Sequence, residues 1–406
     1  MVRTLKYILT KVLKPLGVLS LYHIALAFGG ALFSGFPSKK LKVIGVTGTK
    51  GKSTTLELIN AGLEVAGKKT TLASSVRFKV GDRSKPNSTG NTMPGRGFLQ
   101  KLMADGLKVG CEYALLEVVS EGIVQSRHRF IDFDAAAFVN LHPEHIESHG
   151  GFENYRDAKL KFFEDVERYS SKKDVRFFIN QDDDNANYFI NAVDSESVVL
   201  TTKTNKELKM PGDFNLQNAG LAEAILRFLE ISEKDIEKAF REFAGVPGRM
   251  EILQERPFGV IVDYAHTPDS LEAVYTSVKK MFKGNLIGVF GSMGALGPLG
   301  GRDRWKRPKM GEIAAKYCEE IILTDEDPVD EDPTQILEEI ERGIKDKHKV
   351  KKILDRRQAI RAALDLAQRG DVVVVTGKGS EPYIRIAKGK RIPWSDVGVV
   401  KELLRK

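Results

Sequence analysis

Residues 46–55 read "VTGTKGKSTT", a Gly-rich stretch that contains Lys52 and Ser53. The apolar run 41–45 before it is typical of a short strand, and apolar positions from 53 to 66 recur at helical spacing. A strand, a Gly-rich turn, Lys-Ser and a helix form a phosphate-binding loop, whose backbone N–H groups and helix N-terminus face an anion. In such a loop the lysine reaches the outer phosphates and the serine hydroxyl binds Mg²⁺, so we expect ATP as the ligand. The alternative, a Gly-rich turn with a solvated lysine, is disfavoured by the flanking elements.

The composition is that of an ordinary globular chain. With 406 residues, 42% of them hydrophobic and 29% charged, the chain has material for two or three domains. The net charge of +8 comes from scattered basic residues, which favours phosphorylated small substrates over nucleic acid. Cys111 and Cys318 are the only cysteines, which excludes a disulfide framework and a thiolate zinc site and fits a reducing cytoplasm.

The N-terminal segment is unusually apolar. Residues 15–38 contain no Asp, Glu, Lys or Arg, and lysines stand on both sides of them. A membrane span needs about 20 apolar residues, and this run is borderline. A signal for export would separate the phosphate loop from cytosolic ATP, and a helix packed on the protein itself is the other alternative. We expect contact with a membrane surface, at the inner face of the cell membrane and on the cytoplasmic side.

Strands alternate with helices in both halves of the chain, which predicts an α/β fold with mostly parallel sheets. We expect an apolar segment over 1–40, a central P-loop ATPase domain over 41–245 and a C-terminal Rossmann-like α/β domain over 246–406. The Gly/Ser/Asn/Pro-rich stretch 79–94 predicts a long substrate-facing loop, and 216–243 is helical by its period.

Two apolar runs, 113–118 and 135–140, have the length of buried strands and end in polar residues. In an open parallel sheet, ligands bind at the carboxyl ends of the strands. Glu117 and residues 140–145 are therefore expected where the chemistry takes place.

Nine motifs follow one another in the order of a known family. They are "VTGTKGKSTT" (46–55), "LEVVSEGIVQSR" (116–127), "FVNLHPEHIESHGGFENYRDAKLKFF" (138–163), "GDFNLQNAGLAEA" (212–224), "GVPGRME" (245–251), "VDYAHTPDSLEAV" (262–274), "GGRDRWKRPKM" (300–310), "TDEDPVDEDP" (324–333) and "TGKGSEPY" (376–383). Together they resemble the Mur ligases, and within them the MurE type. The resemblance implies an ATP-dependent ligase of peptidoglycan precursor synthesis. In that family a muramyl-peptide carboxylate is activated as an acyl phosphate and then joined to the amine of an amino acid.

The resemblance also implies roles for individual residues. The positions that hold ATP in the family are matched by Thr47, Gly48, Thr49, Lys50, Gly51, Lys52, Ser53, Thr54, Asn218, Arg249 and Asp263. The catalytic positions are matched by Lys52, Lys159, His145 and Glu117. Two Mg²⁺ ions are expected, one bound by Ser53 and Glu117 and the second by His145. Lys159 stands where the family carries a carbamate made from lysine and CO₂; taken alone, it would be read as a solvated helix lysine.

The acceptor and the incoming amino acid have their own positions in the family. These are matched by Asn91, Thr92, Ser120, Gln125, Arg127, His266, Arg302, Glu326, Asp327, Pro328, Val329, Gly377 and Glu381. A carboxylate such as Glu381 suits a distal ammonium. Members that add diaminopimelate have Arg at the position of Val329, where it pairs with the second carboxylate. Val329 therefore favours a diamino acid with one carboxylate, such as lysine.

The chain departs from the family before the phosphate loop. About 40 residues precede it, too few for the usual N-terminal domain that binds the uridine nucleotide. The acceptor is thus either UDP-linked or lipid-linked. We expect a monomer. Two other functions stay open: a ligase of the same superfamily acting on a poly-γ-glutamyl or folyl carboxylate, and a membrane-tethered ATPase that makes no bond.

Overall fold

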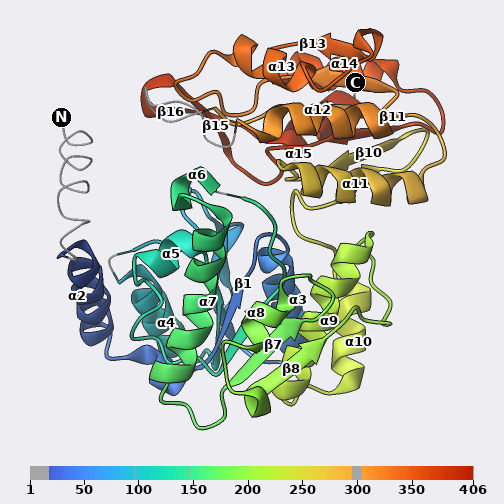
Figure 1. Cartoon of the computed structure of the whole chain (residues 1–406). Coiled ribbons are helices and arrows are strands. Elements are labelled where there is room, and N and C mark those ends of the chain that lie inside the picture. The colour runs from blue at the N-terminus through green and yellow to red at the C-terminus, as the bar shows by residue number, and fades with distance from the viewer. Residues whose placement is uncertain (1–17, 96, 145, 295–303, 406) are drawn as a thin grey trace. The chain divides into compact units, whose positions relative to one another are not determined.

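The computed structural model describes residues 18–95, 97–144, 146–294 and 304–405 (Figure 1). The chain divides into two compact units. The first contains the chain up to Leu141 together with 153–207 and 216–243, and the second contains 142–152, 208–215 and 244–406.

The first unit is built on an eight-stranded sheet with the order β4-β3-β2-β5-β1-β6-β7-β8. Its strands are β1 (Lys42–Thr47), β2 (Thr70–Ala73), β3 (Arg77–Val80), β4 (Arg83–Pro86), β5 (Tyr113–Glu117), β6 (Ala135–Phe138), β7 (Arg176–Asn180) and β8 (Val198–Thr201). The six strands from β2 to β8 in this order are parallel, and β3 and β4 are added in antiparallel fashion at one edge. The mostly parallel sheet predicted for this region is confirmed.

The helices of this unit are α2 (Val18–Phe33), η1 (Pro37–Lys40), α3 (Lys52–Val65), α4 (Phe98–Lys108), α5 (Ser120–Val124), α7 (Phe152–Tyr169), α8 (Ala186–Ile190), η2 (Ser195–Ser197), α9 (Asp213–Phe228) and α10 (Glu233–Glu242). Aromatic side chains fill the space beside β1. A Cβ atom on Gly45 would lie 2.6 Å from the ring of Phe162 and 2.7 Å from that of Phe133, so only glycine fits between them.

One expectation for this unit was wrong. The stretch 79–94 is not one long loop, because β3 and β4 form a hairpin whose turn includes Gly81 at φ 57°. The stretch 216–243 is helical as expected and contains most of α9 and all of α10. The chain turns at Glu230, which has φ 60°, and Ser232 then caps α10 by accepting a hydrogen bond from the Asp235 N–H.

The second unit is built on a six-stranded sheet with the order β13-β12-β11-β14-β10-β9. Its strands are β9 (Glu251–Gln254), β10 (Gly259–Val262), β11 (Leu286–Phe290), β12 (Glu320–Leu323), β13 (Val350–Lys352) and β14 (Val372–Val375), with a separate hairpin of β15 (Tyr383–Ile386) and β16 (Lys390–Pro393). All neighbours in the six-stranded sheet are parallel except β9, which pairs with β10 in antiparallel fashion.

Helices cover both faces of this sheet. They are α11 (Pro268–Met281), α12 (Lys306–Tyr317), α13 (Pro333–Glu341), α14 (Arg356–Leu366) and α15 (Asp396–Leu404). The unit also contains the short elements α6 (Ile146–His149), η3 (Lys347–Lys349) and η4 (Ala387–Gly389). The strand β14 is buried on both faces, which explains its unbroken run of valine. Val372 and Val374 lie in the core under α11 to α13, and Val373 and Val375 lie in the core under α14 and α15.

The N-terminal helix α2 has 16 residues and lies against α4. Their backbones approach closely, since a Cβ atom on Gly30 would lie 2.5 Å from the Cα of Gly97. Among the described residues, no helix combines the length and the hydrophobicity needed to cross a membrane.

Candidate active site

The loop between β1 and α3 has the backbone of a phosphate-binding loop. Gly48 and Gly51 have φ values of 148° and 81°, a region that favours glycine. Asn140, just after β6, holds the loop by accepting from the Lys50 N–H at 2.8 Å with its side chain and from the Thr49 N–H at 2.9 Å with its backbone carbonyl. A Cβ atom on Gly51 would lie 2.2 Å from the side-chain oxygen of Asn218, so the loop and this predicted ATP-binding residue are in direct contact.

Two of the predicted magnesium ligands, Ser53 and Glu117, lie together near the carboxyl ends of β1 and β5. The Ser53 hydroxyl donates to Glu117 Oε2 at 2.7 Å, and the Ser75 N–H donates to the same oxygen at 2.8 Å. Lys52 Nζ donates to the Thr49 carbonyl at 2.8 Å and lies 3.9 Å from Glu117 Oε1. A hydroxyl and a carboxylate are the hard oxygen donors that Mg²⁺ prefers, so this pair fits that ion. Ser75 was not predicted, although its place after β2, the neighbour of β5, could have indicated it.

Lys159, on α7, reaches the same loop. Its side chain is buried, and Nζ donates to the Gly48 carbonyl oxygen at 2.7 Å. The ammonium lies 4.7 Å from the ring centroid of Tyr155, whose hydroxyl is 3.1 Å from the Thr49 hydroxyl. The reading of Lys159 as a solvated helix lysine is therefore excluded.

Two predicted residues, His145 and Arg302, lie outside the described residues. Elsewhere in the described chain, no group of three or more His, Cys, Asp and Glu side chains could hold a metal ion. His266, which was predicted to bind substrate, lies in the second unit with its Nε2 2.9 Å from Glu144 Oε1 and its Nδ1 2.8 Å from the Tyr264 carbonyl.

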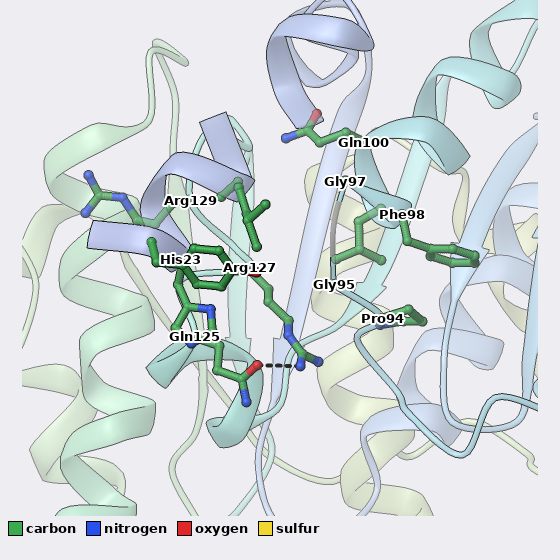
Figure 2. A pocket seen from close by; sticks show the side chains of 13 residues that line it. His23, Pro94, Gly95, Gly97, Phe98, Gln100, Gln125, Arg127 and Arg129 are labelled. Carbon is green, nitrogen blue, oxygen red and sulfur yellow. Dashed lines mark hydrogen bonds between the residues drawn. The ribbon is translucent and has the colours of Figure 1, made fainter. Parts of the chain in front are cut away.

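Three predicted acceptor-binding residues, Asn91, Gln125 and Arg127, form one hydrogen-bonded group in the first unit. The guanidinium of Arg127 donates to Asn91 Oδ1 at 3.1 Å and to the Met93 carbonyl. It also donates to Gln125 Oε1 at 2.6 Å (Figure 2). Thr92 belongs to the same loop as Asn91, and Ser120 is the buried first residue of α5. Burial lowers the pKa of Arg127, but the group stays a cation at any ordinary pH.

Arg127 and Gln125 also line a cavity of about 240 Å³. The opposite wall comes from α2, through Tyr22, His23, Leu26 and Ala27. Figure 2 shows His23 beside the Gln125–Arg127 pair, whereas the guanidinium of Arg129 points away from Arg127. Arg129 instead lies over the ring of Tyr169, 3.7 Å from its centroid.

Two predicted nucleotide-binding residues belong to the second unit. The side chain of Asp263 accepts from the Met250 N–H at 2.7 Å and from the Ala265 N–H at 2.6 Å. It therefore orders the turn after β10. The guanidinium of Arg249 lies over the ring of Tyr264, 4.1 Å from its centroid.

The predicted amino-acid-binding carboxylates surround a lysine that was not predicted. Lys378 is fully buried, and its Nζ donates to Asp327 Oδ1 at 2.7 Å and to Glu381 Oε2 at 2.5 Å. Burial lowers the pKa of Lys378, but the charges of Glu381 and Asp327 outweigh it and raise the pKa above its ordinary value. Arg385 was missed as well; it lies 3.6 Å from Asp327 and 3.7 Å from Glu381.

Glu326 is the third predicted carboxylate in this part of the second unit. It is buried against Gly377, where a Cβ atom would lie 2.4 Å from Glu326 Oε2, and that oxygen has no hydrogen-bond partner among the described residues. Burial raises the pKa of Glu326 to about 7. Pro328 and Val329 follow in the same loop. Val329 is buried with φ 56°, and its N–H donates to the Arg385 carbonyl at 3.2 Å.

Comparison with known proteins identifies both units. The Mur ligase middle domain matches residues 46–224, and the Mur ligase glutamate ligase domain matches residues 248–379. UDP-N-acetylmuramoyl-L-alanyl-D-glutamate–2,6-diaminopimelate ligase of Aquifex aeolicus is 37% identical over 397 residues, which cover 92% of this chain and 79% of that protein. UDP-N-acetylmuramyl-tripeptide synthetase of a Roseiflexus species is 33% identical over 424 residues, with 94% and 82% covered.

Solved structures of other proteins are also similar to this chain. The structure of a UDP-N-acetylmuramoyl-L-alanyl-D-glutamate–2,6-diaminopimelate ligase has a TM-score of 0.59 and 29% identity, covering 90% of this chain and 78% of that one. A folylpolyglutamate synthase of Mycobacterium tuberculosis has a TM-score of 0.71 at 15% identity, covering 94% and 95%, and shows a shared fold.

The phosphate loop and these matches define an ATP-dependent ligase that forms amide bonds. The chain belongs to the Mur ligase family, in its MurE-type branch.

Proposed function

We propose that the protein joins a diamino acid to the free carboxylate of a muramyl dipeptide, in the synthesis of peptidoglycan precursors. The relatives named above support this acceptor, since their names specify an L-alanyl-D-glutamate or a tripeptide product. The observation that carries the proposal is that Lys52 and Lys159 both donate to the Gly48 carbonyl, while Glu117 lies 3.9 Å from Lys52 and accepts from the Ser53 hydroxyl.

The reaction has two steps. A carboxylate oxygen of the acceptor attacks the γ-phosphorus of ATP, the bond from that phosphorus to the bridging oxygen breaks, and ADP leaves. The unprotonated amine of the diamino acid then attacks the acyl carbon, inorganic phosphate leaves, and an amide forms. Both partners of the first step are anions, so the site must supply positive charge. Lys52 and the loop N–H groups supply part of it.

We propose Mg²⁺ as the cofactor, with Ser53 and Glu117 as its ligands in the first unit. When bound, it offsets the repulsion between carboxylate and triphosphate. We further propose a second ion at His145 and a carbamate on Lys159. Burial of Lys159 beside the loop supports the carbamate, because a CO₂ adduct would turn a buried cation into an anionic metal ligand next to the ATP phosphates.

The remaining ATP contacts are assigned from the matching positions in the Mur ligase family. We propose that Asn218 and Arg249 contact the nucleotide and that Asp263 accepts from the ribose. The contact of Asn218 with the phosphate loop at Gly51 supports the first of these roles.

For the diamino acid we propose the cluster of Glu326, Asp327 and Glu381 in the second unit, with Arg302 as the partner of the α-carboxylate. Lys378 and Arg385 pair with Asp327 and Glu381 there, and Glu326 Oε2 has no hydrogen-bond partner among the described residues, so this oxygen can accept from an ammonium of the substrate. Val329 favours lysine, which has a single carboxylate. The second candidate is diaminopimelate, and the nearby cation Arg385 is the observation in its favour.

We also propose a monomer on the cytoplasmic side, where ATP is available, in contact with the inner face of the cell membrane through residues 15–38. The described part of that segment, α2, supports the contact because its outer side chains are apolar and exposed.

A substrate panel tests the function. The purified chain is given ATP, Mg²⁺, a muramyl-L-alanyl-D-glutamate acceptor and one amino acid at a time, and the product is identified by its mass. We expect one new amide per ADP, with lysine preferred over diaminopimelate, and no product from the matched Lys52→Met variant. Product with folyl or poly-γ-glutamyl acceptors, or ATP hydrolysis without an amide, would contradict the proposal.

A further inference from the structure

The outer side of α2 carries a continuous apolar stripe. Leu21, Ala25, Phe28 and Leu32 recur at helical spacing and are all exposed, with Leu21 exposed to 68% and Leu32 to 55%. Phe33 at the end of the helix is 94% exposed. No residue of α2 is charged. A surface helix normally turns polar residues outward, so this face requires an apolar partner.

The charge around α2 identifies the kind of partner. Residues 1–40 contain no Asp or Glu and six basic residues, Arg3, Lys6, Lys11, Lys14, Lys39 and Lys40. Of these, Lys39 and Lys40 lie exposed in η1, directly after α2. An apolar stripe flanked by basic residues is complementary to a membrane surface with anionic lipids, whereas a protein partner would not need this excess of positive charge.

The inner side of α2 forms one wall of each of two hollows. The first is the cavity of about 240 Å³ at Gln125 and Arg127, whose lining has the side chains of His23 and Arg127 and no acidic residue, while the guanidinium of Arg129 is turned away from Arg127 (Figure 2). The second, of about 650 Å³, runs between α2 and α4 and shares Leu26 and Gly97 with the first.

The second hollow is mainly apolar. Leu26, Gly29 and Phe33 belong to its lining on the α2 side, and on the α4 side it has Lys101 and Lys108, which share Asp105 as a partner. A basic pocket beside an apolar groove suits a ligand with an anionic head and a hydrocarbon chain.

We propose that the acceptor is a muramyl peptide carried by a membrane lipid through phosphate. In this arrangement α2 rests its apolar stripe on the membrane, and the cavity on its other side receives the phosphate-bearing sugar of the acceptor. The inference rests on the proposed function, because Gln125 and Arg127 are its acceptor-binding residues. It assigns α2 as part of the acceptor site, with His23 as a positioning residue for the head group.

Vesicle binding tests the membrane contact. The full chain is sedimented with vesicles of phosphatidylcholine alone and with vesicles that contain phosphatidylglycerol. We expect it to bind the anionic vesicles, and the bound fraction to fall at least about tenfold in the double variant Leu21→Asp, Leu32→Asp. Leu200→Asp is the matched control, since Leu200 is exposed to 50% on β8 of the same unit and its variant should bind like the natural chain. A chain that stays in solution with anionic vesicles overturns the proposal.

The acceptor is tested by comparing two carriers of the same muramyl dipeptide, one linked to UDP in solution and one linked by pyrophosphate to a polyprenol in those vesicles. We expect kcat/KM to be at least about tenfold higher for the lipid-linked acceptor, and the double variant to lose this advantage while its rate with the UDP-linked acceptor stays unchanged. Equal or faster turnover of the UDP-linked acceptor overturns the inference and leaves the proposed function standing. No product with either carrier contradicts the proposed function itself.

His23→Ala separates a site role from a structural one. We expect the KM for the lipid-linked acceptor to rise several-fold while the KM values for ATP and for the amino acid stay the same. Ser20→Ala is the control on the exposed side of the same helix. A KM for the lipid-linked acceptor that does not change, or an equal change in all three KM values, rules out a role of His23 at the head group.

Discussion

Lys52 and Lys159 donate hydrogen bonds to the same acceptor, the carbonyl oxygen of Gly48, at 3.0 and 2.7 Å. One lysine comes from the start of α3 and the other from the middle of α7, more than a hundred residues later in the chain. Two ammonium groups on one carbonyl repel each other, and the carboxylate of Glu117 lies 3.9 Å from the first. A modification that turns Lys159 into an anion would relieve this repulsion.

Replacement of Lys159 by alanine tests that role. We expect Lys159→Ala to lower amino-acid-dependent ADP release by about 10²-fold or more, because it removes the group proposed to hold charge at the phosphates. Short carboxylic acids such as formate or acetate should restore part of the rate by supplying the missing carboxylate. Lys161→Ala is the control, since Lys161 lies on the same helix but is half-exposed and pairs with Asp165 at 3.3 Å. Full activity of the alanine variant contradicts the role.

The glycine at position 51 gives a second prediction, about ATP binding. Gly51→Ala and Gly67→Ala each place an alanine at positive φ, 81° and 74°, which costs about 1–2 kcal/mol of stability. Only at Gly51 does the new Cβ meet another group, the side chain of Asn218; at Gly67 nothing lies within 4 Å.

We therefore expect Gly51→Ala to lose at least as much stability as Gly67→Ala in denaturant titrations, and the KM for ATP to rise at least about tenfold in Gly51→Ala alone. An equal KM for ATP in the two variants would show that the contact between Gly51 and Asn218 does not matter for the nucleotide.

The phosphate loop and Glu117 could be predicted from sequence because their signals are local. One signal is a Gly-rich turn between a strand and a helix, and the other is a polar residue at a strand end. Each occupies about ten consecutive residues of the sequence. The hairpin of β3 and β4 was missed although Gly81 and Asp82 stand between its strands, because the polar composition of 79–94 was weighed above the turn signal.

Lys378 and Arg385 could not be predicted as part of the amino-acid cluster by the same means. Their partner Asp327 lies 51 and 58 positions earlier in the chain, so the contact exists only in the folded unit. In the sequence, Lys378 appears as one lysine in a Gly-rich turn. The family motif around it pointed to Gly377 and Glu381, which flank Lys378 in the sequence.

The unusual acid at position 326 predicts a pH dependence of stability. Its pKa is about 7 in the folded protein against an ordinary value of 4.5, and burial is the main cause. Between these values the folded state keeps a proton that the unfolded state has released. The contribution of Glu326 to stability is therefore fully present below about pH 4.5 and falls as the pH rises through about 7, by about 3 kcal/mol at most.

Glu326→Gln removes this titration. We expect the free energy of unfolding of the variant to fall less between pH 5 and pH 8 than that of the natural chain, measured in urea at both pH values. Glu312→Gln, at an exposed position on α12, should keep the natural pH dependence. If the free energy of unfolding falls by the same amount between pH 5 and pH 8 in the natural chain and in Glu326→Gln, the prediction is contradicted.

The buried cation Lys378 should be necessary for the second unit to fold stably. Lys378→Met keeps most of the volume but leaves Asp327 and Glu381 without their ammonium, 2.7 and 2.5 Å away. Arg385, 3.6 and 3.7 Å from these carboxylates, supplies only one of the two positive charges that they face. Removing one partner from a buried ion pair costs about 3–5 kcal/mol, and we expect a loss of that size in urea unfolding. Lys345→Met, at an exposed position, should change stability by less than about 0.5 kcal/mol. If the two variants are equally stable, Lys378 does not hold the two carboxylates in place, and their position must be set by the backbone donors, of which the Arg385 N–H to Asp327 is one.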